Sequence, residues 1–209
     1  MRASLRHIAR ANRWFGGTAA ALWGLARALA DVPAGASISL LDIGTGAGDL
    51  PRAAERWGRR RGIRIAARGL ERSRVAAHLA REEGVPMIVG DAGALPCRPG
   101  SVDIVLLSQV AHHFAPGSAA TLFRSCHQIA RRALVVADLR RSRLAAAGFT
   151  VGARLLRFDP VTIADGHTSI RRGYTRSELA SLLPPEAEVH RRPGWRLVAV
   201  WRAGAAHAP

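Results

Sequence analysis

The run LDIGTGAGD occupies residues 41–49 and is the most informative stretch of this sequence. A short apolar segment, residues 38–43, leads into glycines at positions 44, 46 and 48, and an amphipathic segment, residues 50–61, follows them. Glycines allow a sharp turn and a close approach of the backbone to a ligand where a buried strand ends. We therefore predict a strand, a ligand-binding loop and a helix, in that order.

Short apolar stretches continue to alternate with helical segments after this run. We predict further strands at residues 63–70, 86–89, 102–107 and 133–137, and helices at residues 73–83 and 119–130. Nearly continuous apolar strands that alternate with helices indicate a parallel sheet with helices on both faces. The expected fold class is α/β, a Rossmann-like doubly wound sheet of about seven strands that are mostly parallel.

The C-terminal part of the sequence follows a different pattern. We predict a helix at residues 140–157, an irregular stretch at 158–173 and a helix that starts at the capping box Thr175–Glu178. Two strands, residues 188–191 and 196–201, are separated by a turn short enough for a hairpin. The last strand should therefore run antiparallel to the others.

The length of 209 residues fits a single domain. We divide it into an N-terminal helical cap (1–36), a ligand-binding core (37–138), a helical lid insertion (139–186) and a C-terminal hairpin (187–203). The cap should contain helices at residues 2–14 and 18–30. Its basic start imitates a transit peptide, but a core strand begins so soon afterwards that we favour a helix of the mature domain.

The formal net charge is +16, and all 31 basic residues are arginine. The surplus is spread along the chain, with +4 over residues 1–36, +5 over 37–138 and +7 over 139–209. Surfaces that bind nucleic acid usually concentrate such charge on one face and add stacking aromatic side chains. The dispersal therefore argues against a nucleic-acid partner.

Composition also bears on the compartment. Two cysteines, Cys97 and Cys126, are too few for a disulfide scaffold and fit a reducing compartment. No apolar run approaches the roughly 18 residues that span a bilayer. We therefore expect a cytoplasmic protein. The arginines of the predicted N-terminal helix, at positions 2, 6, 10 and 13, share one face. One hypothesis is that this face contacts an acidic membrane. The sequence leaves the oligomeric state open.

Carboxylates near the glycine loop narrow the choice of ligand. Asp49 stands where a dinucleotide fingerprint has its third glycine, and a carboxylate there would repel a pyrophosphate. Asp42, just before the loop, adds to this effect. Glu71 and Asp91 follow two further predicted strands, whose carboxyl ends should meet at the same edge of the sheet. Four acidic side chains at one edge favour a cationic ligand without phosphate, such as S-adenosylmethionine, although Asp49 alone could simply stabilise the helix N-terminus.

Several motifs together resemble class I S-adenosylmethionine-dependent methyltransferases over residues 38–138. The resemblance rests on DIGTGAG (42–48), GLERS (69–73), GDAGALP (90–96) and SVDIV (101–105). Within that superfamily the chain is similar to the methyltransferases of ubiquinone and menaquinone biosynthesis. That closer resemblance rests on AHHF (111–114) and NRWFGG (12–17).

The resemblance implies roles for the cofactor-binding residues. The loop residues would line the methionine moiety of S-adenosylmethionine, Glu71 would hold the ribose hydroxyls, and Asp91 with Ala92 would meet the adenine. The full set expected to bind the cofactor is Asp42, Gly44, Thr45, Gly46, Gly48, Asp49, Glu71, Arg72, Asp91, Ala92, Ser108 and Gln109. Cys97 departs from the larger residues common in that family, which should change only the packing beside the adenine.

Methyl transfer needs an acid–base group only when the acceptor keeps its proton. His112 and His113 follow the strand 102–107, next to the expected methyl site, and histidine is suited to proton removal near pH 7. Either could be the base, with His113 slightly favoured, or one could pack and the other cap the next loop. His167, in the expected lid, is a third candidate. We expect no metal, because Asp138 is the only evident carboxylate near the acceptor.

The acceptor should lie between the N-terminal helices and the lid. The residues expected to contact it are Asn12, Arg13, Trp14, Phe15, Phe149, Arg171, Arg172 and Tyr174. The aromatic residues offer apolar surface, and the arginines could grip an anionic or phenolic group, although solvated or paired arginines are more common. Such a pocket suits a small lipophilic phenol, quinol or polyketide methylated on oxygen or carbon, as in secondary metabolism.

Two other functions compete with small-molecule methyl transfer. An RNA methyltransferase or RNA-binding protein would use the arginine surplus. The signature after the strand 102–107 that marks methylation of nucleobase amines is replaced by SQVA, residues 108–111. A non-catalytic partner in a biosynthetic complex would keep the fold without the chemistry, and the intact loop with Glu71 and Asp91 argues against that.

Overall fold

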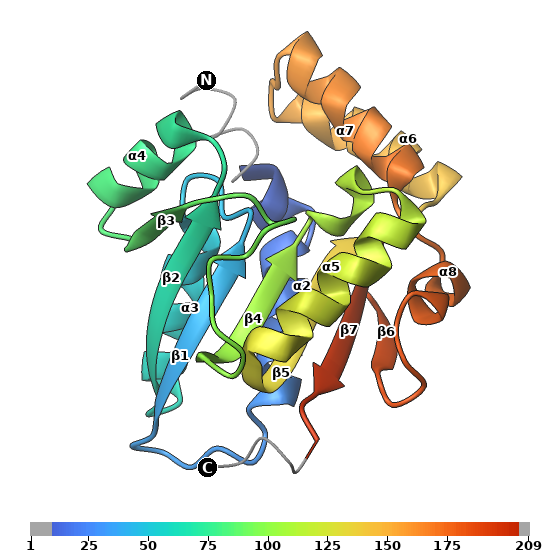
Figure 1. Cartoon of the computed structure of the whole chain (residues 1–209). Coiled ribbons are helices and arrows are strands. Elements are labelled where there is room, and N and C mark those ends of the chain that lie inside the picture. Colours follow the sequence, from blue (N-terminus) through green and yellow to red (C-terminus); the bar gives the residue numbers. More distant parts are fainter. Residues whose placement is uncertain (1–9, 205–209) are drawn as a thin grey trace.

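The protein is described here by a computed structural model covering residues 10–204 (Figure 1). Its centre is a seven-stranded sheet with the order β3-β2-β1-β4-β5-β7-β6. The strands are β1 (Ser37–Ile43), β2 (Arg64–Glu71), β3 (Met87–Val89), β4 (Val102–Ser108), β5 (Ala130–Leu139), β6 (Glu188–Arg192) and β7 (Arg196–Arg202). The helices are α2 (Gly17–Ala28), α3 (Asp49–Arg60), α4 (Arg74–Glu82), η1 (Ala111–His113), α5 (Pro116–Ile129), α6 (Arg143–Leu155), α7 (Pro160–Arg172) and α8 (Arg176–Ser181).

Strand direction confirms the predicted topology. β1 to β5 pair in parallel, whereas β7 runs antiparallel to both β5 and β6. The hairpin turn between β6 and β7 includes Gly194, whose φ of 74° favours glycine. The Rossmann-like class, the seven strands and the reversed last strand are therefore as the sequence predicted.

Apolar side chains on the two faces of the sheet form two cores. Leu41, Ile43 and Val105 face α5, where Phe123 is fully buried. Alternate residues such as Leu40 face the other side, where α2 and α3 cover them. Because both faces are covered, the central strands are apolar on both faces, which explains the nearly continuous apolar runs in the sequence.

The lid is helical along more of its length than the sequence suggested. The stretch 158–173, expected to be irregular, contains helix α7 (Pro160–Arg172), so that expectation is wrong. Asp159 caps this helix by accepting a hydrogen bond of 2.9 Å from the backbone N–H of Thr162, and a proline occupies the first turn. The cap was visible in the sequence, but polar residues and Gly166 obscured the helical periodicity.

The lid helices form a third, small core of their own. Phe149 of α6 packs with Phe158 and with Ile170 of α7, and Phe15 from the N-terminal segment joins them. Figure 1 shows α6 and α7 above the end of the sheet to which the arrowheads of β1, β2 and β4 point. The lid therefore covers the carboxyl ends of the parallel strands.

The N-terminal cap is described only in part. Residues 10–14 are helical and α2 follows, in agreement with the two helices predicted. Residues 1–9 lie outside the described part of the chain, and so do Arg2 and Arg6 of the expected basic face. None of the helices within residues 10–204 combines the length and the apolar character required to cross a membrane.

Gly24 lets α2 approach the sheet closely. A Cβ atom at this position would lie 2.5 Å from Cγ1 of Val135 and 2.9 Å from Cγ1 of Val198. We predict that Gly24→Leu lowers the free energy of unfolding by ~1–3 kcal/mol, because the larger side chain must displace α2 from β5 and β7. Urea denaturation followed by circular dichroism measures the change.

Ala19, exposed on the same helix, provides the control. Ala19→Leu should leave the free energy of unfolding within about 0.5 kcal/mol of the wild-type value. Equal stability of the two variants would show that α2 does not depend on close approach at Gly24.

Candidate active site

The glycine loop joins β1 to α3 and has the strained backbone that its sequence indicated. Gly44, Gly46 and Gly48 have φ values of 69°, 58° and 77°, a region that other residues rarely adopt. A Cβ atom on Gly44 would lie 2.5 Å from Cγ2 of Val110. The loop is anchored to β2, because the backbone N–H of Gly44 donates to the carbonyl of Leu70 at 2.8 Å.

Two carboxyl groups lie against this loop, the buried Asp42 and the half-buried Asp49. Asp42 is 2% exposed and accepts a hydrogen bond of 2.6 Å from the hydroxyl of Thr45. Burial raises the pKa of Asp42 to about 8; the Thr45 hydrogen bond opposes the shift, and repulsion from Asp49 and Glu71 adds to it. Burial also raises the pKa of Asp49. The site thus favours a cation that would compensate these carboxylates.

A cavity of about 500 Å³ extends from the glycine loop to the lid. Its walls come from the N-terminal segment, the loop, the ends of β4 and β5, the lid helices and the hairpin turn before β7. Apolar side chains of Phe15, Leu139, Phe149, Val161 and Ile170 contribute to this lining. The cavity therefore connects the expected cofactor site with the expected acceptor site.

The cofactor-binding residues predicted from sequence divide into two groups. Those that line the cavity are Asp42, Gly44, Thr45, Gly46, Asp49, Ser108 and Gln109. Gly48, Glu71, Arg72, Asp91 and Ala92 belong to the same edge of the sheet but do not line it. Glu71 accepts hydrogen bonds from the backbone N–H of Gly46 at 3.0 Å and of Ser73 at 2.8 Å. The contacts of Glu71 with the ribose and of Asp91 and Ala92 with the adenine remain predictions.

Only half of the predicted acceptor residues reach the cavity. Asn12, Phe15, Phe149 and Arg172 line it, whereas Arg13, Trp14, Arg171 and Tyr174 do not. Trp14 is 69% exposed, and Arg171 donates to the hydroxyl of Thr168 on its own helix. The Tyr174 hydroxyl points elsewhere, because it donates to the carbonyl of Ala111 at 2.8 Å. Tyr174 therefore supports η1.

The three candidate histidines have different surroundings. His112 is buried, and its Nδ1 lies 2.7 Å from Oδ1 of the fully buried Asp138. His113 also lines the cavity but is exposed, and its ring lies against that of His112, with centroids 4.1 Å apart. Burial lowers the pKa of His113, the neighbouring His112 and Arg172 add to the shift, and the Asp138 carboxylate opposes it. His167 does not line the cavity; its Nε2 contacts the hydroxyl of Thr150 at 2.9 Å between the lid helices.

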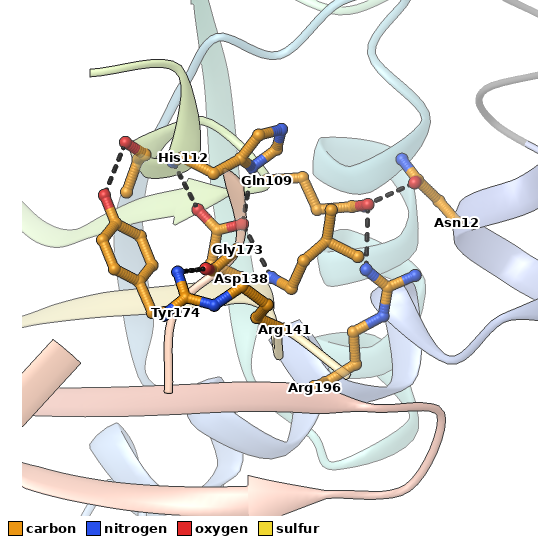
Figure 2. Close-up of polar contacts among 10 residues, drawn as sticks. Asn12, Gln109, His112, Asp138, Arg141, Gly173, Tyr174 and Arg196 are labelled. Atoms are coloured by element: carbon orange, nitrogen blue, oxygen red, sulfur yellow. Dashed lines mark hydrogen bonds and ion pairs between the residues drawn. The ribbon is translucent and has the colours of Figure 1, made fainter. Parts of the chain in front are cut away.

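Sequence reasoning did not identify Arg196. This residue opens β7, is only 4% exposed and lines the cavity. Its guanidinium donates to the carbonyl of Phe15 at 3.0 Å. It also donates to Oε1 of Gln109 at 3.0 Å, and Gln109 in turn donates to Asn12 (Figure 2). Burial lowers the pKa of Arg196 to about 10. Among so many arginines, its position in a predicted hairpin gave no sign that it would be buried.

The sequence and the fold of this chain are similar to those of known proteins. Residues 41–135, from the end of β1 into β5, match the model of a family described as a methyltransferase domain. The chain carries a methyltransferase domain. Methyl transfer by this class uses S-adenosylmethionine, so the protein is an S-adenosylmethionine-dependent methyltransferase. No curated protein gives a match to the sequence.

Solved structures share the fold of this methyltransferase. Magnesium protoporphyrin IX methyltransferase from Synechocystis PCC 6803, with bound S-adenosylhomocysteine, is 16% identical, with a TM-score of 0.53 over 88% of this chain and 81% of that one. A methyltransferase from Aquifex aeolicus is 15% identical, with a TM-score of 0.54 over 83% and 86%. A plantazolicin methyltransferase is 17% identical, with a TM-score of 0.60 over 89% and 70%.

The residues present fit the cofactor of this class. The strained backbone of Gly44 and Gly46 lines the cavity without side chains, and Asp42 and Asp49 line it where a sulfonium and an ammonium would be stabilised. The cofactor supplies an electrophilic methyl group. The chain binds it, excludes water and holds the acceptor.

Asp42 makes cofactor binding depend on pH. Because its pKa is about 8, Asp42 is mostly protonated at pH 7, and a cation beside it favours the carboxylate. We predict that S-adenosylmethionine releases up to one proton on binding and binds more tightly as the pH rises from about 6 to about 8. Calorimetry in two buffers of different ionisation enthalpy measures the release.

Asp42→Asn should remove the dependence of the binding enthalpy on the buffer. Asp31→Asn, which changes an exposed carboxylate paired with Arg132, is the control and should keep it. Identical wild-type enthalpies in both buffers would contradict the protonated state of Asp42.

Proposed function

We propose that this methyltransferase transfers the methyl group of S-adenosylmethionine to oxygen or carbon of a small, lipophilic, aromatic acceptor. The cavity under the lid carries the proposal. Its volume of about 500 Å³, which the cofactor and the acceptor would share, falls within the range typical of small-molecule sites. Its lining combines large apolar side chains with polar groups, which suits a phenol, quinol or polyketide.

The chemistry requires little more than alignment and dryness. Methyl transfer is an in-line displacement at a carbon already activated by the sulfonium, so proximity of the acceptor accounts for much of the acceleration. The lid helices and Phe15 line the cavity, and exclusion of water by them and the bound acceptor would strengthen electrostatic interactions inside it. Polar side chains such as Arg172, Thr168 and Ser169 are available to orient the acceptor.

The comparisons support a small-molecule acceptor without naming it. Two of the solved structures are named for the compounds they methylate, magnesium protoporphyrin IX and plantazolicin. The motifs AHHF and NRWFGG favour the branch that methylates quinone precursors. An RNA substrate would need an extended basic surface beside the cavity, and the dispersed arginines do not favour one.

Gly46 offers a direct test of cofactor binding. We predict that Gly46→Arg abolishes saturable binding of S-adenosylmethionine in calorimetry, because the side chain fills the loop and strains a backbone with a φ of 58°. Gly117→Arg is the control, since a side chain there meets nothing within 4 Å, and its binding should equal that of the wild type. A wild-type protein that does not bind the cofactor would refute the proposed function.

A further inference from the structure

We propose that His112 is the general base of this enzyme, that Asp138 positions its ring, and that the acceptor is a hydroxyl compound methylated on oxygen. This inference rests on the proposed function and narrows it to one acceptor chemistry. It also assigns the role of base to His112, whereas the sequence slightly favoured His113.

Parallel pairing brings the two residues together. β4 pairs in parallel with β5, with Ser108 opposite Ala137, so η1 after β4 lies beside Asp138 near the end of β5. The backbone N–H of His112 donates to Oδ2 of Asp138 at 3.1 Å, and Nδ1 of the ring lies 2.7 Å from Oδ1 (Figure 2). Both side chains are buried, with exposures of 2% and 0%.

These contacts set the tautomer of His112. Asp138 also accepts the backbone N–H of Leu139 at 2.7 Å, so donors approach both of its oxygens and it acts as an acceptor. The proton of a neutral His112 ring therefore resides on Nδ1, which leaves Nε2 with a lone pair. Nε2 is buried and has no hydrogen-bond partner within residues 10–204, although His112 lines the cavity. A buried acceptor nitrogen without a protein partner indicates a donor on the ligand.

The surroundings of His112 hold it in place. The Tyr174 hydroxyl donates to the carbonyl of Ala111 in the same short helix, and the backbone N–H of Gln109 donates to the carbonyl of Ala137. The ionisable groups near the pair include His113, Tyr174 and Arg196, and Arg172 lies near His113. Neither alternative base is oriented in this way. His113 lines the cavity too, but it is exposed and its ring lies against that of His112, whereas His167 contacts Thr150 within the lid.

A positioned base narrows the class of acceptor. A carboxylate is already ionised near pH 7, and a neutral amine attacks through its own lone pair, so neither needs a base before transfer. A phenolic hydroxyl has a pKa of about 10 and gains from proton removal as it attacks. Nε2 takes the hydroxyl proton, the oxygen forms a bond to the methyl carbon, and the electrons of the broken carbon–sulfur bond remain on sulfur. The products are an aryl methyl ether, S-adenosylhomocysteine and protonated His112.

Histidine nitrogen NMR tests the tautomer without any acceptor. With the full-length protein labelled with ¹⁵N-histidine and bound to S-adenosylhomocysteine, we expect Nδ1 of His112 to be protonated and Nε2 to be bare. In Asp138→Asn, an amide replaces one acceptor oxygen, and its NH₂ group would face either the ring or the backbone N–H of His112. The ring should then change tautomer or lose its fixed orientation. A wild-type ring protonated only on Nε2 would overturn the proposal.

Two phenols test the chemistry. With 4-methylphenol, whose hydroxyl keeps its proton near pH 7, His112→Gln should lower kcat about 100-fold or more and leave KM nearly unchanged. With 4-nitrophenol, which ionises near neutral pH, the same variant should lose far less activity. Asp138→Asn should follow the same split between the two phenols, as expected of a positioning residue. His78→Gln changes an exposed side chain of α4 and is the control; its activity on both phenols should equal that of the wild type.

Three results would overturn this inference. They are equal loss of activity on both phenols in His112→Gln, transfer of the methyl group to ring carbon, and absence of methyl ether from either phenol. Calorimetry on the same preparations separates the two proposals. Normal binding of S-adenosylmethionine with any of these results would refute this inference alone, whereas absent binding would refute the methyltransferase function itself.

Discussion

Parallel pairing of β1 with β2 on one side and β4 on the other is the constraint on which the site depends. In register, Asp42 lies opposite Gly69 of β2 and Leu106 of β4, so the three strands end together. Every loop that leaves this edge must turn within the same small volume, and the glycine loop, Glu71, Ser108 and η1 meet there. The antiparallel β7 then adds Arg196 from the opposite chain direction. Sheet direction, more than any single side chain, assembles the cavity.

The fold could be predicted because its signals are local. The glycine loop, the alternating apolar strands and the hairpin turn each reveal themselves within a few residues. The existence of α7 was missed although Asp159 and Pro160 mark its start, because its residues lack a clear apolar face. A capping residue and a proline at N1 predict a helix reliably only when the residues that follow also show helical periodicity.

Much of the site lies beyond local patterns because it depends on register and burial. The pairing of His112 with Asp138 joins residues 26 positions apart, and nothing in either neighbourhood specifies it. Tyr174 was expected to contact the acceptor, but the turn after α7 directs its hydroxyl to Ala111. The positions of Asp42 and Asp49 at the cavity could be predicted, because both residues adjoin the glycine loop in the sequence.

The contribution of a charged side chain in this protein depends on whether it is exposed or buried. The surplus of arginine is large, yet most of it is distributed on the surface, where single charges contribute little. The few buried ionic groups matter more. Asp42 and Arg196 line the cavity, and Asp138 lies against His112, which also lines it. Removal from water makes the protonation of Asp42 sensitive to whatever enters the cavity.

Arg196 joins the two ends of the described chain, because it binds the carbonyl of Phe15 and, through Gln109, reaches Asn12. Gly194 supports this junction, since a Cβ atom there would lie 2.5 Å from the same carbonyl oxygen. During synthesis on the ribosome, the glycine loop can fold against β2 and β4 long before β7 emerges. The part of the cavity wall that Arg196 provides cannot form until β7, the last strand, has been synthesised. The acceptor side of the cavity is therefore incomplete in any nascent chain that lacks β7.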